Sequence, residues 1–72
     1  RNKSTGRGVA VRFDGFPYLL IWQKCGAPYI CIEPWCGIPD YIDSTGRILE
    51  KPGIIVAAPG ETVVRTHTVR LI

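Results

Sequence analysis

Hydrophobic residues occur in short runs separated by glycine, proline and polar residues, as in proteins built from β-strands. In residues 9–13 they alternate with polar residues, which places the valines and the arginine on opposite faces of a half-buried strand. An Asp-Gly turn separates this segment from residues 18–22. That second run is apolar on both faces and predicts a central strand covered on each side.

The chain returns from the second strand through residues 25–27, a short glycine-containing loop of the kind that joins antiparallel strands. The returning strand is predicted over residues 28–33. We expect it to end at Glu33, because Pro34 has no N–H to continue a ladder. Since side chains alternate along a strand, Glu33 should share a face with Cys31.

The remainder of the chain alternates between loop and strand patterns. Residues 34–53 are rich in glycine, proline and aspartate, which predicts a long loop. Residues 54–58 and 61–72 then predict two more strands, the last an edge strand with His67 in its middle. No helix of useful length is indicated. The pattern predicts an all-β protein with an antiparallel sheet, in a sandwich or a barrel.

Length and composition limit the chain to a single domain at most. It has 72 residues, of which 46% are hydrophobic, a large share for so short a chain. Small domains bury little of their surface, so this composition indicates that the chain packs against more protein. Because the chain also lacks methionine, we interpret residues 1–72 as one partial domain.

Charge and cysteine content argue against several classes of function. The net charge is +3, but the nine basic residues are spread along the chain rather than gathered with aromatic platforms, so nucleic acid is not expected as a partner. The longest apolar run is far shorter than the roughly 20 residues of a membrane span. Three cysteines without a Cys-x-x-Cys pair favour free thiols in a reducing cytoplasm over disulfides or zinc. We expect no metal and no cofactor.

Glu33 is the leading candidate for chemistry. It is a carboxylate at the end of an apolar strand, beside Trp35, where it can act as a general base. It can equally be structural, paired with an arginine such as Arg12 or accepting backbone N–H bonds from the next turn. Trp22 and Trp35 can form a platform on which a sugar stacks, or can pack in a core.

Other polar residues have simpler interpretations. Asp40 and Asp43 lie in the long loop, where aspartate commonly stabilises turns. A lone histidine such as His67 is more often a hydrogen-bonded strand residue than a catalyst. Cys31 and Cys36 have no neighbouring base to activate a thiolate, so we expect small buried side chains.

The order of residues around Glu33 resembles the C-terminal part of the aldose 1-epimerases, the galactose mutarotase-like proteins. The most specific part is Cys31-Ile32-Glu33-Pro34-Trp35, within a likeness that is strongest over residues 16–40. It is nearest to the bacterial branch that includes a protein encoded in lactose operons. The likeness continues to the end of the chain through Lys51-Pro52-Gly53-Ile54 and Pro59-Gly60-Glu61.

This resemblance implies that the chain is the C-terminal segment of a large antiparallel β-supersandwich. It implies an enzyme that interconverts the α and β anomers of an aldose, with a monosaccharide as substrate. Glu33 would be the general base, and a histidine donates a proton to the ring oxygen. That histidine comes from segments that precede anything present here, and His67 does not match it. The isolated chain should therefore be inactive, and should need the preceding part of the domain or a second copy as partner.

Two other functions remain open from the sequence. One is a non-catalytic carbohydrate-binding or structural β module, with Trp22 and Trp35 as its platform and Glu33 as a hydrogen-bond acceptor. The other is a small basic β domain that binds nucleic acid.

Overall fold

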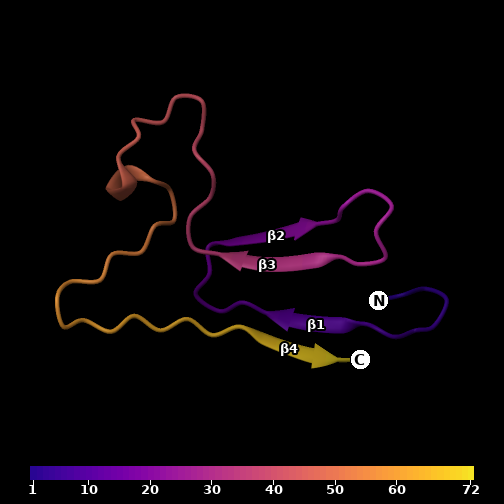
Figure 1. Ribbon diagram of the computed structural model, residues 1–72. Coiled ribbons are helices and arrows are strands. Elements are labelled where there is room, and N and C mark those ends of the chain that lie inside the picture. Colours follow the sequence, from indigo (N-terminus) through magenta and orange to yellow (C-terminus); the bar gives the residue numbers. More distant parts are fainter.

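The structure is a computed structural model that describes residues 1–72, and it contains strands and a single short helical turn (Figure 1). The strands are β1 (Val9–Arg12), β2 (Tyr18–Trp22), β3 (Cys31–Trp35) and β4 (Thr68–Leu71), and the 3₁₀ helix η1 spans Ile48–Glu50. They form two separate two-stranded antiparallel sheets, β1–β4 and β2–β3. The all-β class is therefore confirmed. The one helical turn is far too short to cross a membrane.

The β1–β4 sheet joins the two ends of the chain. Val9 pairs with Leu71 and Val11 with Val69, so these four apolar side chains share one face. Beyond the paired strands, Gly8 and Ile72 exchange two backbone hydrogen bonds of 2.7 and 2.9 Å. The strand predicted over residues 9–13 is confirmed, but its burial does not alternate, because Val9 is exposed and Ala10 is half-buried. The pairing of β1 with the distant β4 was not expected from the sequence.

The β2–β3 sheet is the hairpin that the sequence predicts. Leu20 lies opposite Glu33, and Trp22 lies opposite Cys31. The connection contains a turn in which the Ala27 N–H donates to the Lys24 carbonyl at 3.0 Å, with Gly26 at a positive φ of 77°. The antiparallel pairing is therefore confirmed.

β3 begins and ends later than predicted, and it contains Pro34. The two ladders share ten backbone hydrogen bonds. In an antiparallel ladder, pairs that exchange two hydrogen bonds alternate with pairs that exchange none. Gly8 and Ile72 form a bonded pair, so two of the pairs within β1–β4 are bonded as well and account for four of the ten bonds. The other six belong to β2–β3. The β2–β3 ladder has five pairs, and it can hold six bonds only if its first, third and fifth pairs are the bonded ones. Leu19–Pro34 is the second pair, so it is one of those without hydrogen bonds. The missing N–H therefore costs this ladder nothing, and the prediction that Pro34 ends the strand is wrong.

Three other strand predictions are also wrong. Residues 54–58 form no strand, and in the last segment only Thr68–Leu71 does, so that His67 precedes β4. β2 pairs with β3 alone and is not central. Strand-like composition yields a ladder only where another strand lies alongside, and no strand of the structure pairs with residues 54–58 or 61–67.

The long loop after β3 closes on itself. Its two ends meet where Gly53, at a φ of 74°, packs against the Tyr18 ring and the Gly37 backbone so closely that a Cβ would clash. Lys51 Nζ also forms an ion pair with Asp40 Oδ1 at 3.3 Å, and this lysine side chain is only 28% exposed. These contacts tie the loop to the end of the β2–β3 hairpin.

The chain has no hydrophobic core of its own. No residue is buried, and apolar side chains such as Ile21, which is 60% exposed, lie open on both sheets. The molecule is a slab of 47 × 31 × 14 Å with a radius of gyration of 16.1 Å. A compact domain of this length has a radius of gyration of about 11 Å.

The solvent-accessible surface area also shows that the chain is not compact. It measures 6200 Å², against about 4,450 Å² for a compact protein of this mass. The difference of about 1,700 Å² is roughly twice what one partner contributes to a standard interface. The chain therefore leaves far more surface exposed than a compact protein of its mass.

We expect the 72-residue chain, expressed alone, not to unfold cooperatively as a monomer, because it has no buried core to lose. Urea unfolding followed by near-UV circular dichroism, with the mass measured by light scattering, checks this. The full-length protein is the control and should unfold cooperatively. A monomeric 72-residue chain with a sharp transition would contradict the expectation.

Gly53→Ala should destabilise the full-length protein more than Gly60→Ala. Both glycines have positive φ, which costs an alanine about 1–2 kcal/mol. Only Gly53 is enclosed, so its new methyl group adds an overpacking cost of about 1–3 kcal/mol. Urea midpoints of the two variants measure the difference. Equal losses of stability would show that the close approach at Tyr18 is absent.

Candidate functional site

One face of the β2–β3 sheet carries the residues that the sequence singles out. Side chains directly opposite one another in an antiparallel pair share a face. The register therefore puts six side chains together, in the pairs Tyr18–Trp35, Leu20–Glu33 and Trp22–Cys31. Glu33 occupies the middle of this face, which we call the Glu33 face.

The Glu33 carboxylate is half-buried and held by a neighbour on its own strand. The Trp35 Nε1–H donates to Glu33 Oε2 at 3.0 Å. The two residues are two positions apart, and in a strand this spacing places both side chains on the same face. Glu33 therefore lies on the face that the sequence predicts.

The expected structural partners of Glu33 are not the ones observed. Arg12 Nη2 instead pairs with Asp14 Oδ2 at 3.3 Å, and both side chains are largely exposed. No backbone N–H donates to the Glu33 carboxylate; its partner is the Trp35 side chain. The purely structural pairing considered from the sequence is therefore not present in the chain.

Trp22 and Trp35 lie on either side of Glu33 along the sheet. They belong to the first and last pairs of the ladder, and Glu33 belongs to the central pair. Trp22 is 49% exposed, and its ring tilts against Tyr29 with centroids 6.3 Å apart and an interplanar angle of 50°. Trp35 is half-buried and lines a shallow apolar hollow at the end of the hairpin.

This arrangement can accept a proton and can hold a flat, partly apolar ligand. A carboxylate is a base when ionised, and indole faces stack on apolar ligand surfaces. The other titratable groups on the Glu33 face are Cys31 and Tyr18. His67 lies outside this sheet, exposed and ahead of β4. The face thus combines one carboxylate base with aromatic neighbours and no histidine.

Of the two aspartates that the sequence singles out in the long loop, Asp40 has a structural partner. Asp40 pairs with Lys51, as described above, and Asp43 is exposed. Cys25 is exposed. Cys31 and Cys36 are only half-buried, so the expectation of small buried side chains at these two positions is wrong. No three acidic, cysteine or histidine side chains lie together as metal ligands.

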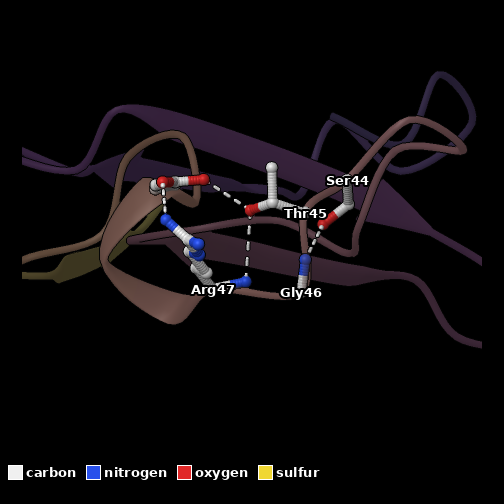
Figure 2. Close-up of polar contacts among 5 residues, drawn as sticks. Ser44, Thr45, Gly46 and Arg47 are labelled. Atoms are coloured by element: carbon white, nitrogen blue, oxygen red, sulfur yellow. Dashed lines mark hydrogen bonds and ion pairs between the residues drawn. The ribbon is translucent and has the colours of Figure 1, made fainter.

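The structure adds a loop cluster that the sequence did not indicate (Figure 2). Arg47 Nη1 lies 3.4 Å from Glu50 Oε1, and the Thr45 hydroxyl donates to the other carboxylate oxygen. The backbone N–H groups of Arg47 and Gly46 donate to the Thr45 and Ser44 hydroxyls. The signal that could have revealed it is the Ser-Thr-Gly turn followed by an Arg and a Glu three residues apart. All its members are exposed, and it links the turn before η1 to Glu50, the last residue of η1.

Comparison with known proteins gives one group of relatives. Over 73 aligned residues the chain is 27% identical to Protein LacX of Lactococcus lactis subsp. lactis, in both its plasmid and its chromosomal form. The alignment covers 100% of this chain and 24% of LacX, so the chain spans about a quarter of the length of these relatives. No protein-family model and no solved structure matches the chain. The chain is therefore similar, along its entire length, to a segment of LacX.

Proposed function

We propose that the chain is a segment of an aldose 1-epimerase, in which Glu33 is the general base for interconverting α and β anomers. The observation that carries the proposal is the half-buried Glu33 carboxylate, held on an otherwise apolar and aromatic face of the hairpin. The Cys-Ile-Glu-Pro-Trp string around it supplies the resemblance to that family. The chain matches LacX over its whole length, and this match supports the resemblance to the lactose-operon branch of the family.

The proposed reaction needs a base and an acid on one sugar. The Glu33 carboxylate takes the proton of the anomeric hydroxyl while an acid donates a proton to the ring oxygen, which opens the ring. C1 then rotates, and the ring closes with the opposite configuration as the protons return. The acid is a histidine from another part of the protein. Since both proton transfers must be positioned on one substrate, this segment alone should not catalyse the reaction.

The proposal implies a monosaccharide substrate and a cytoplasmic protein without a cofactor. The partner of this segment would be the preceding part of the same domain, packed on the uncovered sheets, or a second copy of the chain. The exposed apolar residues of both sheets supply the surface for this packing.

A non-catalytic carbohydrate-binding module is the second candidate. The observation in its favour is that Trp22 and Trp35 occupy one face with a hydrogen-bond acceptor between them. Sugars are commonly recognised by an apolar ring face stacked on an aromatic side chain, with polar groups at its edge. In this case Glu33 binds a hydroxyl group and transfers no proton.

Glu33→Gln should reduce mutarotation by the full-length protein about 10²- to 10⁴-fold, the usual contribution of a general base. The substitution keeps the side-chain size and an acceptor oxygen for Trp35, but it removes the basic carboxylate. Polarimetry of freshly dissolved α-galactose or α-glucose measures the rate. Glu61→Gln, at an exposed turn, is the matched control and should retain the wild-type rate. A Glu33→Gln variant as fast as wild type would remove the base assignment.

Sugar titration separates the two candidates. In an epimerase, galactose or glucose should change the tryptophan fluorescence of the full-length protein and should also exchange anomers. Glu33→Gln should then abolish exchange while leaving the titration saturable, because it preserves the tryptophans. Saturation with no exchange by the wild-type protein would favour the binding module.

A further inference from the structure

The bond between Trp35 and Glu33 differs from the other polar side-chain contacts of the chain. The remaining hydrogen bonds between side chains, within the loop cluster, join exposed groups. The ion pairs of Arg12 and Arg47 are exposed as well. Trp35–Glu33 is the one side-chain hydrogen bond between partly buried groups. A hydrogen bond is stronger where water is partly excluded. Of the side-chain contacts in the chain, this one should therefore hold its side chain most firmly.

The geometry of the bond leaves part of the carboxylate available. Trp35 Nε1 donates to Oε2 at 3.0 Å, and no group of the chain donates to Oε1. Indole N–H is a donor only, so it cannot take the proton that Glu33 would accept from a substrate. The contact therefore holds one oxygen of the base and leaves the other for chemistry.

Trp22 provides an internal comparison. It is the other tryptophan of the Glu33 face, but its ring lies against Tyr29 and its N–H makes no hydrogen bond within the chain. If both indoles served only as a stacking platform, replacing either with phenylalanine would have similar effects. If Trp35 acts through its N–H, the same replacement should lower turnover more at Trp35 than at Trp22.

We propose, resting on the assignment of Glu33 as the base, that Trp35 is a positioning residue. Its indole N–H fixes the orientation of the Glu33 carboxylate. A glutamate side chain has three rotatable bonds, and a base must be held within a fraction of an ångström of its working position. A displacement of about 1 Å can reduce a rate about 100-fold. β3 supplies both residues, so the strand itself sets their spacing.

The first test uses the indole N–H resonances of the ¹⁵N-labelled full-length protein and does not depend on activity. The Trp35 resonance should move as Glu33 takes up a proton at acid pH, and this response should disappear in Glu33→Gln. Cys31 and Tyr18 are the other titratable groups on this face, and the matched titration of Glu33→Gln identifies any response that comes from them. A Trp35 resonance that does not respond to pH, or that responds equally in Glu33→Gln, would overturn the proposal.

The second test compares Trp35→Phe with Trp22→Phe in mutarotation. Trp35→Phe should lower kcat about 10- to 100-fold with little change in KM, because substrate binding is retained while the base loses its orientation. Trp22→Phe should lower kcat less than Trp35→Phe does, because Trp22 makes no hydrogen bond to Glu33. Dispersed amide spectra of both variants verify that they fold.

The outcomes distinguish the base role of Glu33 from the positioning role of Trp35. If Glu33→Gln is slow but Trp35→Phe keeps the wild-type kcat, the positioning role fails and the base assignment stands. If Glu33→Gln is itself as fast as wild type, the proposed function fails, and the positioning role fails with it. Slow turnover in Glu33→Gln and in Trp35→Phe, together with a Trp35 resonance that responds to pH only when Glu33 is present, supports both roles.

Discussion

The register of the β2–β3 ladder decides which residues share the Glu33 face, and the candidate site depends on it. A slip of one residue would turn Glu33 to the opposite face, away from Trp22. Pro34 opposes such a slip, because it has no N–H and sits in a pair that needs none. In the slipped register it would enter a hydrogen-bonded pair and leave a carbonyl of β2 without its donor. Pro34, next to Glu33 in β3, thus helps to determine on which face of the sheet the carboxylate lies.

The uncovered sheets and the incomplete site have a common explanation in the proposed function. Both sheets expose apolar side chains, and the chain has no core of its own. The Glu33 face offers a base and aromatic neighbours but no histidine. A partner segment that covered these sheets would bury the apolar surface, lower the local dielectric around Glu33 and bring the acid. The close approach of Gly53 to Tyr18 and Gly37 would then hold the long loop at the rim of the same face.

Local patterns in the sequence predicted the all-β class, the β2–β3 hairpin and the face on which Glu33 lies. They failed where distant parts of the chain decide the outcome. The pairing of β1 with β4 joins opposite ends of the chain. The segment 54–58 and the first part of the strand predicted over 61–72 pair with no other strand. Pro34 was misjudged because its effect depends on which pairs of the ladder carry hydrogen bonds. The Trp35–Glu33 bond follows from strand alternation once Pro34 is known to lie within β3.

The central claim is that the Glu33 carboxylate moves a proton during anomer exchange. Exchange spectroscopy of an equilibrated aldose, in the presence of the full-length protein, measures the catalysed rate directly from the α and β anomeric protons. The account predicts exchange cross-peaks with the wild-type protein and none above the uncatalysed level with Glu33→Gln at the same concentration. Cross-peaks of equal intensity for the two proteins would contradict it.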